Sequence, residues 1–283
     1  MGFYQHKIGK AIAHWLNQEV YAYPSPALSN FERMKQELHI GDVLLVEGRT
    51  RISHVINLLT LSPWTHSALY IGRIYDIQDP KLREIVYKHY QGAPEEQLLI
   101  ESLLGKGVIV TPLSRYKDYH VRICRPKGIN FRHAQAVIAY VIGNLGVQYN
   151  IRQIFDLARF LLPWSILPRR WRSSIFSYHA GSQTRLTCSL LIANAFASIR
   201  FPILPYIRES NEHGLEFIHR NPQLFTPSDF DYSPYFDIIK YPLTDLPNAA
   251  PFEHLPWAND EIISNDHGDF YSLSENKKLP KKK

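Results

Sequence analysis

The sequence predicts an α+β fold in which a small antiparallel sheet packs against helices. Short apolar segments of strand length follow one another in the first half of the chain, and segments with helical periodicity come after them. This segregation favours α+β over a parallel α/β sheet, in which strands and helices would alternate. With 283 residues, 45% of them hydrophobic, the chain is long enough to bury one substantial core.

The N-terminal region predicts two short helices in front of the sheet. Residues 1–20 show amphipathic periodicity, and the prolines within residues 21–30 end that pattern. A second helix is expected over residues 31–38, with Ser29 or Asn30 as its N-cap.

Five apolar segments predict the strands of the sheet: residues 43–46, 66–72, 98–103, 108–113 and 121–126. A helix or turn is expected over residues 53–60, and residues 76–96 are expected to form turns. Residues 131–146 have apolar side chains at helical spacing and predict a helix that ends near Gly146.

The most apolar helix contains a cysteine in its first turn. In RLTCSLLIANAFASIR, residues 185–200, nearly every side chain is apolar, so the helix is expected to be buried on most sides. Thr184 or Thr187 can cap its start, which leaves Cys188 near the positive end of the helix dipole, where the pKa of a thiol is lowered. Alternatively, Cys188 is a small buried core residue, as free cysteines often are.

A histidine begins the strand predicted at residues 66–72. His66 shares one face of that strand with Ala68 and Tyr70. If the strand at residues 98–103 pairs with it antiparallel, Glu101 can lie against the imidazole and support its protonated form. Taken singly, His66 would be an ordinary core or edge histidine and Glu101 a solvated charge, so the interpretation depends on the whole set.

Six motifs in order resemble a known family: GDVLLVEG, SPWTHSALYIG, LLIESLLGKGVIVTPLSRY, LGVQYN, TCSLLIANAF and TPSDFDYSPYF. Together they are similar to the permuted papain-like amidases of the YiiX/YaeF type. These belong to the wider superfamily of NlpC-type cell-wall peptidases and of lecithin:retinol acyltransferase. In the usual order of that superfamily the cysteine helix precedes the histidine strand, whereas here His66 comes before Cys188.

The resemblance implies a circularly permuted papain-like fold and a catalytic triad. In it, Cys188 is the nucleophile, His66 the general base and then acid, and Glu101 the third polar group. Leu190 stands where family members often carry an acid, so the substrate contact of that acid is not implied. We further predict substrate contacts for three aromatic residues: Trp64, Tyr149 and Trp164.

Three segments follow from these motifs. We expect an N-terminal helical extension at residues 1–38, a catalytic domain at residues 39–240, and an extended tail with a lysine-rich end at residues 241–283. Residues 152–180 form an insertion in which aromatic and arginine side chains alternate. Such composition suits a membrane interface or an acyl-chain pocket, and equally a packed surface excursion with solvated arginines.

Composition excludes several classes of function. The net charge is +6, but five lysines lie in the last seven residues, so the remainder is nearly neutral and offers no basic stripe for nucleic acid. The two cysteines, Cys124 and Cys188, form no disulfide framework or zinc motif, and we expect neither a metal nor another cofactor. With no signal peptide or transmembrane segment recognised, a cytoplasmic protein is expected, with possible peripheral membrane contact through residues 152–176.

The function predicted from these features is cysteine-dependent hydrolysis of an amide bond, of peptide or isopeptide type, through an acyl-enzyme. Two alternatives stay open. One is a lipid acyl hydrolase or acyltransferase at a membrane surface, and the other is a catalytically silent binding module on the same fold. The expected substrate is therefore a small peptide, an amide or a lipid.

Overall fold

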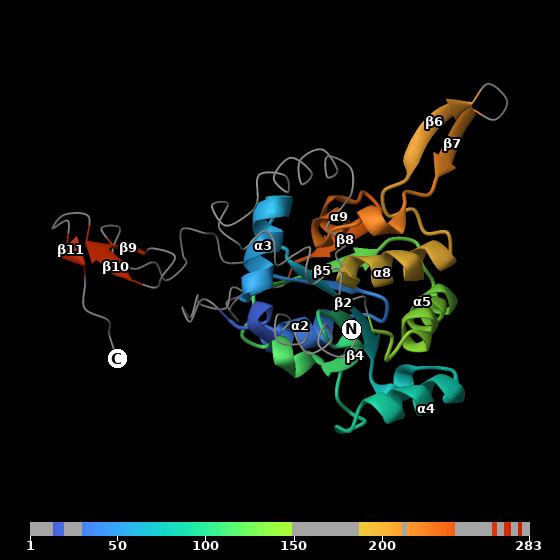
Figure 1. The fold of residues 1–283 in the computed structure, drawn as a ribbon, viewed down its shortest axis with the longest axis horizontal. Coiled ribbons are helices and arrows are strands. Elements are labelled where there is room, and N and C mark those ends of the chain that lie inside the picture. Colours follow the sequence, from blue (N-terminus) through green and yellow to red (C-terminus); the bar gives the residue numbers. More distant parts are fainter. Residues whose placement is uncertain are drawn as a thin grey trace, which may run out of the picture.

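A six-stranded antiparallel sheet in the order β4-β3-β2-β1-β5-β8 forms the centre of the computed structural model (Figure 1). Its strands are β1 (Val43–Val46), β2 (His66–Gly72), β3 (Leu98–Leu103), β4 (Gly107–Pro112), β5 (Val121–Pro126) and β8 (Phe236–Ile239). The structure describes residues 14–19, 30–148, 187–210, 214–240, 262–264, 269–272 and 277–278. The predicted α+β class and all five predicted strands are confirmed, and β8 is an additional edge strand.

The helices that the described residues form beside the sheet include α2 (Phe31–Glu37), α3 (Arg51–Thr60), α4 (Pro80–His89), α5 (Phe131–Gly143), α8 (Thr187–Ser198) and α9 (Pro227–Tyr232). Short 3-10 turns add Ile74–Asp76, Leu113–Tyr116 and Pro222–Leu224. Asn30 caps α2 and Asn130 caps α5, each accepting a hydrogen bond from a backbone N–H of the first turn.

The prediction of turns over residues 76–96 was wrong, because α4 occupies its centre. Asp79 caps this helix by accepting a hydrogen bond from the backbone N–H of Lys81, and Pro80 follows at the first helical position. An Asp-Pro pair is as good a helix start as a turn signal, and Val86, which is fully buried, ties the helix to the core.

The two faces of the sheet pack against different helices. Alternate residues of β1 divide between them: Leu45 joins the core formed with α5 and α8, whereas Leu44 joins a second core with Met34 of α2. In β2, Leu69 and Ala68 divide in the same way. The apolar helix α8 therefore lies directly on β2, which brings its first turn beside the start of that strand.

Phe196 of α8 is the centre of an aromatic cluster in the larger core. It is fully buried, and its ring centroid lies 5.1 Å from that of Phe201 and 5.4 Å from that of Phe236.

Phe196→Ala is expected to lower the free energy of unfolding by about 3–5 kcal/mol, because it removes buried surface and leaves a cavity. Denaturant unfolding measures this, with Phe131→Ala as control, since Phe131 is 59% exposed. Equal effects of the two substitutions would contradict the packing described.

The remaining strands form two smaller sheets. A hairpin pairs β6 (Tyr206–Ser210) with β7 (Gly214–Ile218). Three short strands lie within the predicted C-terminal tail: β9 (Ile262–Ser264), β10 (Phe270–Ser272) and β11 (Lys277–Lys278). The aromatic and basic insertion at residues 152–180 and most of the predicted helix at 1–20 lie outside the described residues. No helix in the described part combines the length and the apolar content needed to cross a bilayer.

Candidate active site

Cys188 is the second residue of α8 and is 5% exposed. Its thiol meets β2, where Ser67 supplies hydrogen bonds from its backbone N–H and its side chain. Ser189, the next residue of α8, lies 3.9 Å from the sulfur through its hydroxyl oxygen. Cys188 also packs with Ile56 of α3, and Ile52 packs against this pair. The thiol is thus held between a polar strand end and an apolar helix.

His66 and Glu101 meet on neighbouring strands. Because β2 and β3 pair antiparallel with Ala68 opposite Glu101, the carboxylate lies beside the imidazole, and Glu101 Oε2 is 2.5 Å from His66 Nε2. The Glu101 side chain is fully buried, and that of His66 is 15% exposed. Thr111 of β4 and the phenol of Tyr116 also donate hydrogen bonds to Glu101. The carboxylate is therefore fixed by three donors.

The side chains of His66 and Cys188 are coupled, since hydrogen bonding and charge between them raise the pKa of His66 and lower that of Cys188. Because Nε2 of the ring is occupied by Glu101, Nδ1 is the nitrogen left for the thiol. The structure therefore brings three of the six predicted site residues together: Glu101 is hydrogen-bonded to His66, and His66 is electrostatically coupled to Cys188. A thiol, an imidazole and a carboxylate in this order can generate a nucleophilic sulfur.

The pKa values of the three groups favour charged forms despite burial. Burial raises the pKa of Cys188, but hydrogen bonding and charge from His66, together with Ser67, lower it from 9.0 to about 7. Burial lowers the pKa of His66, but hydrogen bonds with Cys188 and Glu101 raise it from 6.5 to about 10. Burial likewise opposes ionisation of Glu101, yet the His66, Thr111 and Tyr116 bonds lower its pKa from 4.5 to about 2. Near neutral pH the site therefore favours a thiolate beside an imidazolium.

The rate of Cys188 alkylation by iodoacetamide is expected to rise as pH increases through about 7, because the thiolate is the nucleophile. Rates measured between pH 5 and 9 by peptide mass mapping test this. His66→Ala removes the cation that stabilises the thiolate, so the inflection should move upward toward 9.0, the ordinary thiol value. An inflection that is unchanged by His66→Ala would contradict the coupling of the two groups.

Of the three predicted substrate-contacting aromatic residues, only Trp64 lies among the described residues. Trp64 is 3% exposed, and its indole N–H donates to Asp231 while the guanidinium of Arg122 lies over its ring. It thereby links α9 to the sheet, and a contact between Trp64 and substrate stays a prediction. Tyr149 and Trp164 lie outside the described residues.

Three residues of the site were not predicted from the sequence: Ser67, Thr111 and Tyr116. Ser67 follows the histidine and points to the opposite face of β2, where it contacts Ser189 at 3.4 Å. Thr111 faces Glu101 because β3 and β4 form a hairpin, so the alternation in VIVTPL could have indicated it. Tyr116 sits in a 3-10 turn after β4, and no local signal predicts that its phenol reaches Glu101.

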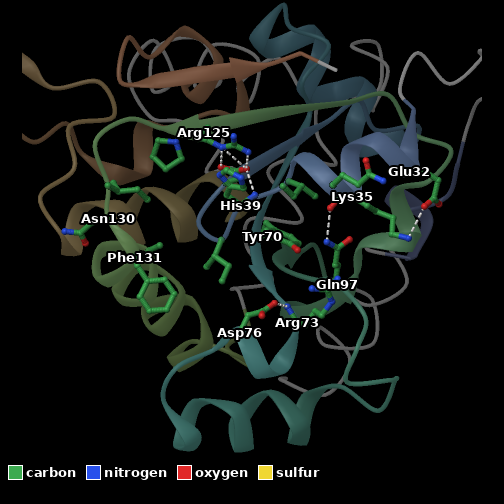
Figure 2. A pocket seen from close by; sticks show the side chains of 17 residues that line it. Glu32, Lys35, His39, Tyr70, Arg73, Asp76, Gln97, Arg125, Asn130 and Phe131 are labelled. Atoms are coloured by element: carbon green, nitrogen blue, oxygen red, sulfur yellow. Dashed lines mark hydrogen bonds and ion pairs between the residues drawn. The ribbon is translucent and has the colours of Figure 1, made fainter. Parts of the chain in front are cut away.

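A cavity of about 780 Å³ lies away from Cys188, at the opposite end of β2. Figure 2 shows Tyr70 at its centre, the Arg125 side chain above, and Arg73 with Asp76 below. Arg125 makes an ion pair of 2.8 Å with the buried Asp42. These two lining residues of the cavity therefore already bind each other and contribute to the fold. Among the described residues, no group of three His, Cys, Asp or Glu side chains is arranged to hold a metal ion.

Comparison with family models supports the resemblance seen in the motifs. Among solved structures, that of the metalloprotein yiiX from Escherichia coli O157:H7 is similar, with 15% sequence identity and a TM-score of 0.41 over 71% of this chain and 96% of that chain. No curated protein is significantly similar in sequence. A family model matches residues 37–158, which include His66 and Glu101 but end before Cys188. The matched family, which confirms the predicted permuted papain-like class, is that of the permuted papain-like amidase enzymes, YaeF/YiiX, C92.

Proposed function

We propose that the protein is a cysteine-dependent hydrolase of amide bonds, with Cys188 as nucleophile. The observation that carries this proposal is the coupling of the Cys188 thiol to His66, whose ring is hydrogen-bonded to the buried carboxylate of Glu101. The family match supports the general class, because the family is one of amidases. The lowered pKa of Cys188 agrees with an activated thiol.

In the proposed first step, the Cys188 thiolate attacks the carbonyl carbon of the amide. The oxygen of the tetrahedral intermediate becomes negative, and backbone N–H groups in the first turn of α8, which have no partner within the helix, can stabilise it. The imidazolium of His66 then gives its proton to the amide nitrogen as the C–N bond breaks. An amine leaves, and the acyl group remains on Cys188 as a thioester.

In the second step, water hydrolyses the thioester. Neutral His66 takes a proton from the water, the resulting hydroxide adds to the carbonyl, and the C–S bond breaks to release a carboxylic acid and the thiolate. Glu101 touches neither substrate nor sulfur and acts as a positioning residue. It holds the ring with Nε2 toward itself and stabilises the imidazolium that accompanies the thiolate.

Trapping the acyl-enzyme tests this proposal. The protein is mixed with an N-acyl aminocoumarin, quenched in acid within the first turnovers, and analysed by intact and peptide mass spectrometry. The expected result is release of aminocoumarin with a transient mass increase of one acyl group on Cys188. If neither product nor adduct forms across peptidyl and fatty acyl donors, a non-catalytic binding module becomes the better interpretation.

A further inference from the structure

A polar group without a partner lies in the cavity beside Tyr70. The cavity volume of about 780 Å³ falls within the range of small-molecule sites, roughly 300–1,000 Å³. Gln97 lines this cavity and donates a hydrogen bond from Nε2 to the carbonyl of Lys35 at 2.9 Å, but its buried Oε1 accepts none from the described residues. An unpaired buried acceptor costs stability, so the cavity favours a ligand that brings an N–H or O–H donor to Gln97.

Two charged side chains of the same cavity, Arg73 and Asp76, form no ion pair with each other or with another described residue. The guanidinium of Arg73 donates from Nε to the carbonyl of Glu95 at 3.2 Å, which uses one of its five N–H donors. Asp76 Oδ2 accepts a hydrogen bond from the backbone N–H of Arg73 at 2.7 Å. The cavity therefore holds one cation and one anion whose charges are not neutralised by a described neighbour.

The remaining Lys, Arg, Asp and Glu side chains that line the cavity are already paired. Arg125 forms its ion pair with Asp42 at 2.8 Å, and Lys35 pairs with Glu32 at 3.2 Å. These groups are satisfied without a ligand. A charged ligand is therefore bound by the unpaired cation and anion.

The backbone at the end of β2 fixes the position of Asp76. Gly72 has a φ of 80°, and a Cβ built there would lie 2.9 Å from Asp76 Oδ2 and 3.1 Å from Ile40 Cγ1. The carboxylate therefore rests directly on the glycine, with an apolar side chain next to it. A residue with a side chain at position 72 would displace the carboxylate.

Tyr70 lies between these polar groups. Figure 2 shows Gln97, Arg73 and Asp76 below its ring. Burial raises the pKa of Tyr70 to about 12, while the charge of Arg73 lowers this pKa and that of Asp76 raises it. The phenol therefore keeps its proton near neutral pH and can donate it in a hydrogen bond. Because both charges act on the phenol, one small ligand beside it can reach the two of them.

The rest of the cavity wall includes apolar side chains. Ile40 and Ile129 pack against the larger core, and Ala134 is 6% exposed. Ile129 approaches the chain closely, because a Cβ at Gly41 would lie 3.4 Å from its Cδ1. This part of the wall can cover an apolar group of a ligand whose polar end lies beside Tyr70.

We infer that this cavity binds a free amino acid with an apolar side chain. The ammonium group of the amino acid donates to Gln97 Oε1 and to the carboxylate of Asp76. Its carboxylate accepts from the guanidinium of Arg73 and from the phenol of Tyr70, and its side chain lies against Ile40. The inference does not depend on the proposed hydrolysis, because the cavity lies at the opposite end of β2 from the nucleophile.

Calorimetric titration of the full chain tests this inference with three compounds that share one carbon skeleton. L-Leucine carries both charges, 4-methylpentanoate lacks the ammonium group, and 3-methylbutylamine lacks the carboxylate. L-Leucine is expected to bind at least about tenfold more tightly than either analogue, because each analogue loses hydrogen bonds to a charged group. The titrations use low ionic strength, since salt screens charges that solvent reaches.

Two substitutions should each remove one of these preferences. Asp76→Asn keeps an oxygen for the backbone N–H but removes the charge, so the preference for L-leucine over 4-methylpentanoate is expected to be lost. Arg73→Gln should instead remove the preference over 3-methylbutylamine. Each variant supplies its own reference ligand, so a general loss of stability does not imitate either result. Lys35→Gln is the matched control: it removes a cation of the same cavity that is already paired, and both preferences should persist.

An absence of saturable L-leucine binding would overturn the inference, as would equal affinities for all three compounds. Preferences that stay unchanged in both Asp76→Asn and Arg73→Gln would place the binding elsewhere on the molecule and contradict the inference as well. Turnover of the aminocoumarin substrate is measured independently. Its absence would remove the proposed hydrolase and leave the amino-acid site standing, and the reverse result would remove only the amino-acid site.

Discussion

Replacing Cys188 by alanine is expected to reduce amide hydrolysis on the order of 10⁴-fold or more, because the covalent step loses its nucleophile. The substitution should leave the fold intact, because it removes only one sulfur atom. Cys188 is 5% exposed and belongs to a small cluster with Ile56, so few packing contacts are lost. Initial rates with an N-acyl aminocoumarin, together with a thermal unfolding curve, measure the two effects separately.

Cys124 provides the matched control. It is the other cysteine of the chain, lies on β5, is fully buried, and has a pKa raised by burial, so it has the properties of an unreactive core thiol. Cys124→Ala is expected to keep hydrolysis and Cys188 labelling near the level of the unaltered protein. Hydrolysis that survives Cys188→Ala, or that is lost in Cys124→Ala, would show that the nucleophile has been misidentified.

The main elements of the fold could be predicted because local signals and packing agree. The strands from β1 to β5 are short apolar segments, and α5 and α8 are apolar at helical spacing, so the class followed from periodicity. Strand β8 was missed because FDII sits in a tyrosine- and proline-rich segment, where its pairing with β5 decides the conformation. Helix α4 was missed because Asp79 and Pro80 signal a turn and a helix start equally well.

The candidate site was predictable only where strand geometry determines it. The phase of β2 and the antiparallel partner β3 are sufficient to bring Glu101 toward His66, and both were read from the sequence. The donors from Ser67 and Tyr116 were not predicted, because they depend on how α8 and the turn after β4 dock on the sheet. Periodicity describes one element at a time, whereas these contacts arise between elements.

Glu101→Gln is expected to lower kcat/KM by about 10² to 10⁴-fold, the range that proton transfer contributes in enzymes. The amide carries no charge to support the imidazolium, so the pKa of His66 should fall and the alkylation inflection of Cys188 should move above about 7. The NH₂ group of the introduced glutamine also faces the hydroxyl donors of Thr111 and Tyr116. One buried donor is then left without an acceptor, which costs about 1–3 kcal/mol of stability. If Glu101 had only a structural role, the pH inflection of Cys188 alkylation would not move in Glu101→Gln.

The acid dependence of stability gives a second readout for Glu101. Its pKa is lowered from 4.5 to about 2, so the carboxylate contributes stability that is fully present above 4.5 and is lost as pH falls toward 2. The stability difference between the unaltered protein and Glu101→Gln should shrink over that interval.

Glu47→Gln is the matched control: Glu47 also pairs with a histidine, His120, at 2.9 Å, but it is 48% exposed. An exposed pair contributes about 0–1 kcal/mol, so this control should change neither activity nor acid stability appreciably. If both substitutions behaved alike, burial of the carboxylate beside His66 could not be the source of the effect.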